Sequence, residues 1–142
     1  SFKVNANDWT NFDLEFKVRR LKENKKDQHF GVVFDTAKGK NQLYCRGGGL
    51  ILWIPPQKIH EQFGIPFEKP LVSGKDVPWT VFNISVKDNV MTVKVDGKQI
   101  GTSDKFLEGV KNIQFYAYGN QIEIDDLRIV AYAADAKKKV TP

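Results

Sequence analysis

The sequence has few of the residues that hold domains together through covalent or metal bonds. It contains one cysteine, Cys45, and two histidines. A single cysteine excludes an intrachain disulfide and a cysteine-cluster metal site. His60-Glu61 is the only adjacent histidine–carboxylate pair, and Gly64 stands where a zinc-binding helix would need its second histidine. We therefore expect a fold held by apolar packing, with no metal centre built on histidine or cysteine.

Long apolar runs and mixed basic–aromatic patches are also missing. No run approaches the roughly 18 apolar residues of a membrane-spanning helix, so we expect no membrane insertion. The formal net charge is +5, but the basic runs at residues 22–27 and 137–139 contain no aromatic residue. Nucleic-acid sites interleave basic residues with exposed aromatic rings. We expect no nucleic-acid binding and interpret the two runs as a solvated loop and tail.

The apolar content that remains is enough for one core. Hydrophobic residues make up 41% and aromatic residues 12% of the 142 residues, too much for a disordered chain. We expect residues 1–136 to form a single domain and residues 137–142 to form a basic C-terminal tail. Between them, Gln57–Pro78 is the least patterned segment, and we expect a long loop there with one or two helical turns within Pro56–Phe63.

Residues 79–100 contain the clearest pattern in the chain. Apolar and polar residues alternate through Phe82–Val86 and again through Met91–Val95, and a period of two places each set on one face of a sheet. Asp88-Asn89 and Asp96-Gly97 separate the runs, and these residue types tolerate the positive φ of two-residue hairpin turns. The stretch predicts three strands joined by two tight turns.

The same alternation recurs along the chain, with turn residues between the runs. It predicts an all-β fold, a two-sheet antiparallel β-sandwich with almost no helix. Further strands are expected at Phe2–Val4, Phe12–Arg20, His29–Asp35, Asn41–Arg46, Leu50–Ile54, Asn112–Tyr118 and Gln121–Tyr132. The expected core comprises Phe12, Leu14, Phe16, Val32, Phe34, Phe82, Ile84, Val93, Val95, Phe115 and Ile124.

The order of these motifs resembles a known family pattern. It runs W-x-x-F-x-L-x-F-x-V, G-V-V-F, W-x-x-F-x-I-x-V, V-x-V-D-G, I-x-F-Y-A-Y-G and I-D-D-L-R-I, over roughly residues 9–132. The chain resembles the concanavalin A-like lectin/glucanase superfamily, and within it laminin G-like modules and the 3-keto-disaccharide hydrolase domain. The resemblance implies a jelly roll that binds glycans on its polar concave sheet or rim loops. Some members hydrolyse glycosidic bonds.

The sequence departs from the hydrolase pattern. Tyr116 and Tyr118 stand where the 3-keto-disaccharide hydrolase domain usually carries Gln and His, and Asp125 stands where it often carries Arg. No acid pair has a spacing suited to glycoside hydrolysis. We therefore expect a non-catalytic carbohydrate-binding module and assign no catalytic residue. The alternatives are a glycoside hydrolase-like enzyme of the same fold and a protein–protein adhesion module.

The candidate ligand-binding residues lie on the polar faces of the expected strands. A pyranose packs its C–H face on an aromatic ring, while its hydroxyls bond to polar side chains, so a sugar suits a polar face with rings in it. The face exists if these strands share one sheet, and the alternative is a solvated sheet face with scattered tyrosines. For Trp53, the alternative is that its ring plugs the end of the sandwich. The candidates are Glu15, Lys17, Arg19, Tyr44, Arg46, Trp53, Gln114, Tyr116 and Tyr118, with Tyr44, Arg46, Tyr116 and Tyr118 at the centre.

The resemblance also bears on cofactors and location. Related carbohydrate-binding modules carry a structural calcium ion near the position of Asp125-Asp126, although calcium needs six to eight oxygen ligands. The alternative is a carboxylate bonded to backbone amides, and no other cofactor is expected. We expect an oligosaccharide or polysaccharide partner and a secreted, periplasmic or cell-surface location, with the chain a module of a larger bacterial protein.

Overall fold

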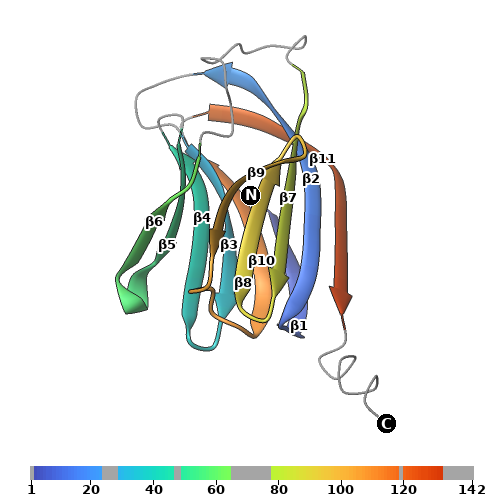
Figure 1. Ribbon diagram of the computed structural model, residues 1–142. Helices are drawn as coiled ribbons and strands as arrows, with labels where there is room; N and C mark the ends of the chain where they lie inside the picture. The colour runs from blue at the N-terminus through green and yellow to red at the C-terminus, as the bar shows by residue number, and fades with distance from the viewer. Residues whose placement is uncertain (1, 24–28, 47–48, 65–77, 119, 133–142) are drawn as a thin grey trace.

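A computed structural model describes residues 2–23, 29–46, 49–64, 78–118 and 120–132 (Figure 1). These residues form eleven strands and one short 3-10 helix. The strands build two antiparallel sheets, one of six strands and one of five, which lie face to face. The expected two-sheet antiparallel sandwich is confirmed. No helix in the described part is long and apolar enough to span a membrane.

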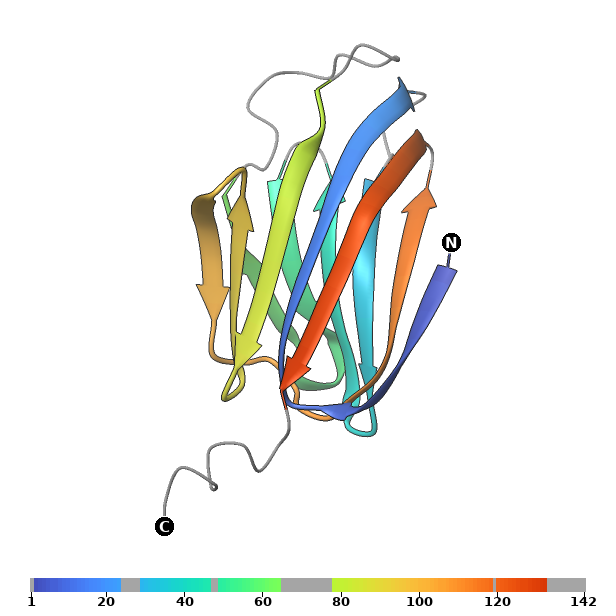
Figure 2. The same cartoon turned by 90° about the vertical axis from the view of Figure 1, so that its right-hand side faces the viewer.

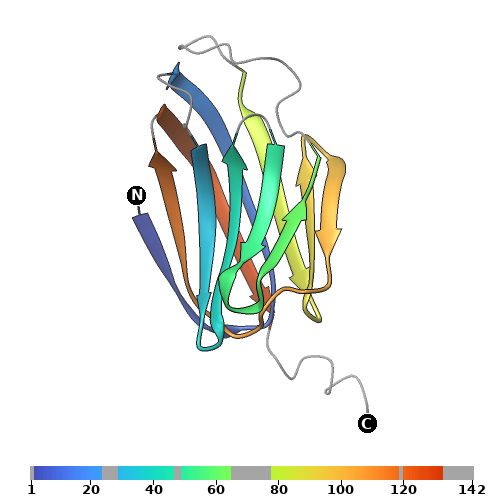
Figure 3. The same cartoon turned by 90° about the vertical axis from the view of Figure 1, so that its left-hand side faces the viewer.

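The six-stranded sheet has the order β1-β10-β3-β4-β5-β6 and faces the viewer in Figure 3. Strands β3 and β10 pair across about eighty residues of sequence, from Thr36 opposite Val110 to His29 opposite Tyr118, with a register shift between Val110 and Asn112. The strands are β1 (Phe2–Trp9), β3 (His29–Thr36), β4 (Gly39–Arg46), β5 (Gly49–Ile54), β6 (Ile59–Gln62) and β10 (Val110–Tyr118).

The five-stranded sheet has the order β11-β2-β7-β8-β9 and faces the viewer in Figure 2. Its strands are β2 (Asn11–Glu23), β7 (Thr80–Lys87), β8 (Val90–Val95), β9 (Lys98–Ser103) and β11 (Asn120–Tyr132). The three strands predicted for residues 79–100 are β7, β8 and β9. Asp88, Asn89, Asp96 and Gly97 all have positive φ, as the predicted hairpin turns require.

The core lies between the inward faces of both sheets. Ten of the eleven predicted core residues are buried, and Ile124 is partly buried against them. Phe16 of β2 connects the two sheets: its ring stacks on Phe82 with centroids 5.3 Å apart and meets Phe115 of the opposite sheet edge-on at 5.2 Å. Each such ring pair stabilises the fold by about 0.5–1.5 kcal/mol beyond the contribution of the apolar area that it buries.

Some element boundaries differ from the sequence-based expectation. The first strand runs to Trp9, with a register shift between Asn5 and Trp9, and β2 continues into the expected loop as far as Glu23. The expected helical turns reduce to the 3-10 helix η1 (Pro55–Gln57), after which the chain returns as β6. The remaining part of the expected long loop, residues 65–77, lies outside the described residues, as do residues 24–28 and the tail from residue 133.

Candidate functional site

The register of the six-stranded sheet aligns its outward side chains in rows across the strands. Residues directly opposite on neighbouring strands lie close enough for their side chains to interact. One row, from β10 to β6, is Gln114, Val33, Gln42, Trp53 and His60. The next row is Tyr116, Gly31, Tyr44, Ile51 and Gln62. We call these two rows together the Tyr44 face.

At Gly31 the neighbouring residues of the Tyr44 face leave no room for a side chain. A Cβ atom at this position would lie 2.8 Å from Tyr44 Cβ and 2.9 Å from Tyr116 Cε1. Because Gly31 has no side chain, the Tyr116 ring lies against the strand beside Tyr44. A glycine within a strand leaves room for a close approach to the backbone, and here the group that approaches is the Tyr116 ring.

Tyr116 is half-buried in this position. Burial, followed by the proximity of Tyr44 and Cys45, raises the pKa of Tyr116 from 10.0 to about 12. Its hydroxyl, like that of an ordinary tyrosine, keeps its proton at neutral pH, and the raised pKa extends this well into the alkaline range. A neutral phenol both donates and accepts hydrogen bonds, as recognition of an uncharged hydroxyl group requires.

Trp53 adds a third ring to the Tyr44 face. It lies on β5 in the row next to that of Tyr44, opposite Gln42 on one side and His60 on the other. Its side chain is 40% exposed, whereas Leu52 and Ile54 beside it are fully buried. The alternative in which Trp53 plugs the sandwich end is therefore wrong.

The structure separates three of the candidate residues from the others. Glu15, Lys17 and Arg19 lie on β2, in the five-stranded sheet, so the assumption that all the candidate strands share one sheet is wrong. Lys17 Nζ pairs with Asp126 Oδ2 at 2.8 Å, and Arg19 Nε pairs with Glu123 Oε1 at 2.6 Å. Lys17 and Arg19 thus form ion pairs within their own sheet.

The backbone register extends the site by a third row. Tyr118 lies opposite His29, which lies opposite Arg46, so the backbone of both predicted central residues is next to the row of Tyr44. The side chains of Arg46 and Tyr118 lie outside the described residues. Gln114, Tyr116, Tyr44 and Trp53 are the candidates whose side chains the structure brings together.

Three polar residues of the Tyr44 face were not predicted: Gln42, His60 and Gln62. The sequence gives little signal for β6, because Ile59 is followed by three polar residues and the alternation of partly buried and exposed residues is visible only in the structure. Pro55-Pro56 also argued against a further strand here. The two prolines stop β5, but the 3-10 turn they form leads directly into β6, and Lys58 completes the reversal with a left-handed φ of 54°.

The aspartate pair considered for a calcium ion lies at an irregularity of β11. Asp126 has a positive φ of 52°, within the register shift between Asp125 and Arg128. Its backbone N–H donates to Asp125 Oδ1 at 2.8 Å. Within the described ranges, no group of three or more His, Cys, Asp or Glu side chains could hold a metal ion. For Asp125 the arrangement matches the carboxylate–amide alternative.

Comparisons with known proteins bear on the fold. No protein-family model matches the sequence, and no curated protein matches it significantly. Among solved structures, sheep galectin-11 in complex with glycerol matches with a TM-score of 0.65 at 14% identity, covering 91% of this chain and 96% of that one. A human galectin-16 variant matches with a TM-score of 0.66 at 18% identity, covering 92% and 95%.

A bacterial protein gives a further match. The carbohydrate-binding module CBM66 from Bacillus subtilis has a TM-score of 0.59 at 9% identity, over 91% of this chain and 77% of that one. These neighbours share one architecture. The fold is the concanavalin A-like jelly roll of lectins. Identities this low establish the jelly roll and leave the ligand to be argued from the residues.

Proposed function

We propose that this jelly roll is a non-catalytic glycan-binding module whose ligand lies on the Tyr44 face. The observation that carries the proposal is the placement of three aromatic side chains on one sheet face, with Tyr44 and Tyr116 flanking Gly31 and Trp53 on the next strand. The similarity to a carbohydrate-binding module and to galectins supports it.

The chemistry of the Tyr44 face suits a neutral sugar. The rings offer broad apolar surfaces for the C–H faces of pyranose units. Gln114, Gln42, His60 and Gln62 lie in the same rows and supply donors and acceptors for hydroxyl groups. One stacked ring and two or three hydrogen bonds of about 0.5–1.5 kcal/mol each support affinities between roughly millimolar and tens of micromolar.

Binding to the Tyr44 face should change little with salt. Between β10 and β6, the described side chains of its two rows include no lysine, arginine, aspartate or glutamate; Lys3 of β1, opposite Gln114, is a cation at the edge of the face. A neutral ligand forms no ion pair with this face, so added salt has little electrostatic attraction to screen. Arg46 in the third row would matter for an acidic glycan only.

The other parts of the proposal concern context. We propose a secreted, periplasmic or cell-surface location and a place within a larger bacterial protein. The narrower resemblance to laminin G-like modules and to the 3-keto-disaccharide hydrolase domain stays a prediction. A reducing-sugar assay on the ligand found would distinguish binding from hydrolysis, and a glycan array without any neutral ligand would favour the adhesion module.

The experiment is a glycan array followed by calorimetry with the best neutral oligosaccharide. We expect Tyr44→Ala and Trp53→Ala each to weaken binding by about tenfold, the loss of one stacked ring at about 1.4 kcal/mol. Tyr132→Ala removes a 42% exposed tyrosine from the opposite sheet and is the matched control. If folded Tyr44→Ala and Trp53→Ala bind as tightly as the parent chain while Tyr132→Ala loses affinity, the ligand does not lie on the Tyr44 face.

A further inference from the structure

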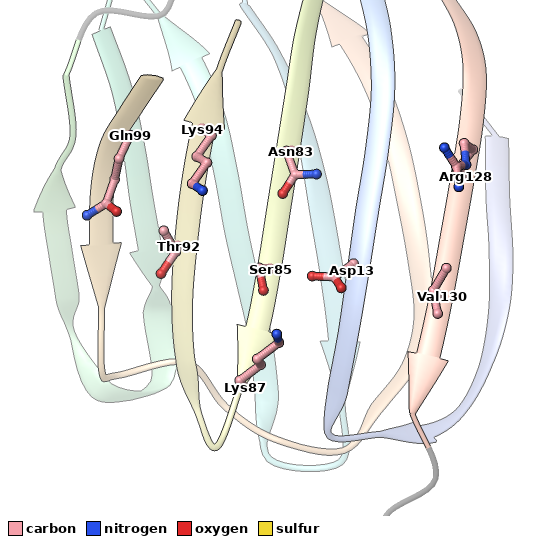
Figure 4. A pocket seen from close by; sticks show the side chains of 9 residues that line it. All are labelled: Asp13, Asn83, Ser85, Lys87, Thr92, Lys94, Gln99, Arg128 and Val130. Carbon is pink, nitrogen blue, oxygen red and sulfur yellow. The ribbon is translucent and has the colours of Figure 1, made fainter. Parts of the chain in front are cut away.

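A hollow of about 530 Å³ lies on the outer face of the five-stranded sheet, opposite the Tyr44 face (Figure 4). Its volume falls within the range of ligand-binding clefts. All five strands contribute to it, and eight of its nine lining side chains are polar or charged. The lining residues are Asp13, Asn83, Ser85, Lys87, Thr92, Lys94, Gln99, Arg128 and Val130. We call this hollow the cationic trough.

Three cations face one carboxylate in the cationic trough. Lys87, Lys94 and Arg128 line it together with Asp13. Among the described residues, neither Lys94 nor Arg128 forms an ion pair with a carboxylate. Glu15 lies opposite Arg128 in the register and accepts a hydrogen bond from Asn83 Nδ2 at 3.4 Å. Even with Glu15 included, the region has an excess of positive charge.

The one carboxylate in the lining is already engaged. Tyr132 donates its hydroxyl to Asp13 Oδ2 at 2.6 Å. Burial raises the pKa of Asp13, but hydrogen bonds from Tyr132 and Ser85 and the charge of Lys87 outweigh burial and hold it below its usual value. Asp13 is therefore ionised at neutral pH and bonded within the sheet, so it leaves Lys94 and Arg128 for a ligand.

The two cations lie on opposite sides of the cationic trough. Arg128 is on β11 and Lys94 is on β8, with Asp13 of β2 and Asn83 and Ser85 of β7 between them (Figure 4). Three strand spacings separate β11 from β8, which is about 14 Å. A ligand that reaches both cations is longer than one sugar ring and needs anionic groups toward its two ends.

The lining contains no aromatic ring, and the exposed ring of Tyr132 lies beside it, bonded to Asp13, so ring stacking is not the main source of affinity within the lining. Charge-assisted hydrogen bonds are then the strongest contacts on offer, because they are about twice as strong as neutral ones. Asn83, Ser85, Thr92 and Gln99 add neutral partners for hydroxyl groups. We propose that the cationic trough is a second binding site, which takes an anionic oligosaccharide bearing sulfate or carboxylate groups.

This site is independent of the Tyr44 face in residues, sheet and ligand charge. The test is calorimetry at about 50 mM and about 500 mM salt, with heparin-derived, hyaluronan-derived and neutral malto-oligosaccharides. We expect the sulfated or carboxylated oligosaccharide to bind at low salt and to weaken at high salt. Lys94→Gln/Arg128→Gln should weaken that binding by about tenfold or more, and Lys94→Arg should retain it.

Matched variants separate the cationic trough from general positive charge. Lys105→Gln/Lys111→Gln removes two exposed charges outside the trough, and Lys137→Gln/Lys138→Gln/Lys139→Gln removes the basic run outside the described residues. Both should bind like the parent chain. Amide shifts in NMR titrations should concentrate on β7, β8 and β11 rather than on β3, β4 and β10.

Four outcomes would overturn the proposal. The first is no binding of either anionic oligosaccharide at low salt, and the second is binding of the neutral one that weakens equally in Lys94→Gln/Arg128→Gln. The third is a loss in either control variant as large as that in Lys94→Gln/Arg128→Gln. The fourth is equally tight binding of a single-stranded oligothymidylate, which would show recognition of charge alone. A failure here leaves the tests of Tyr44 and Trp53 unaffected.

Discussion

At the scale of single residues, the absence of a side chain shapes the Tyr44 face. Gly31 is buried on its strand while its neighbours Tyr44 and Tyr116 are partly buried. The close approach involves main chain as well as side chains, because a Cβ atom at Gly31 would lie 2.7 Å from the carbonyl oxygen of Leu43. A flexible side chain can move away from such a contact, but an atom of the sheet backbone cannot without disturbing the ladder.

We therefore predict that Gly31→Ala destabilises the protein by about 1–3 kcal/mol, the usual range for an overpacked site, and displaces the Tyr116 ring. Urea unfolding gives the stability, and calorimetry with the neutral ligand gives the binding. Because Tyr116 is part of the proposed site, the folded fraction of the variant should also bind more weakly. Wild-type stability together with wild-type affinity would contradict both the packing and the placement of the ligand.

The residue scale also shows how far the sequence could lead. A period of two determines which residues of one strand share a face, and the predicted core from Phe12 to Phe115 is correct for that reason. The same period does not determine which strands pair. Glu15 and Tyr44 alternate equally well, yet the hydrogen-bond register places them in different sheets. Long-range pairing decides the composition of the site.

At the scale of elements, one buried amide holds the segment before β10 to the six-stranded sheet. Asn41 of β4 is fully buried. Its Nδ2 donates to the Leu107 carbonyl oxygen at 3.0 Å, and its Oδ1 accepts from the Leu107 backbone N–H at 2.8 Å. The two bonds replace the ladder bonds that a strand would make. The sequence pattern treated Asn41 only as the start of a strand, because nothing local marks a partner 66 residues away.

We predict that Asn41→Ala lowers the free energy of unfolding by about 2–4 kcal/mol, because two partly buried backbone groups of Leu107 lose their partners at about 1–2 kcal/mol each, the lower part of the usual range. Asn112→Ala is the control. Its Nδ2 donates to Asp35 Oδ2 at 3.3 Å in a partly exposed position. Asn112→Ala should therefore lower the free energy of unfolding by less than about 1 kcal/mol. Urea unfolding of both variants decides the matter, and equal losses would refute a special role for Asn41.

Turn chemistry explains both the successes and the failure at this scale. Asp-Asn and Asp-Gly predicted the β7–β8 and β8–β9 turns because few residues tolerate positive φ. Proline gave an ambiguous signal, since it ends a strand and also opens a turn. Pro55 and Pro56 do both, and β6 with His60 and Gln62 follows.

At the scale of the whole molecule, the sandwich presents two outer faces with different chemistry. The Tyr44 face has rings and neutral polar groups, whereas the cationic trough has lysine and arginine without rings. The buried core, with Phe16 between Phe82 and Phe115, separates the two faces. Stacked sheets lie about 10 Å apart, and the outward side chains add to that separation.

This separation predicts that the two sites act independently. Substitutions more than about 7–10 Å apart without shared partners usually add within about 0.3–0.5 kcal/mol. In a double-variant cycle, Tyr44→Ala should weaken the neutral oligosaccharide equally with or without Lys94→Gln/Arg128→Gln. The charge variant should in turn weaken the anionic oligosaccharide equally with or without Tyr44→Ala. Calorimetry of the parent, the two variants and their combination measures both couplings. A coupling above about 1 kcal/mol would mean that one ligand reaches both sheets or that binding changes the packing of the core around Phe16, and either result contradicts two separate faces on a rigid sandwich.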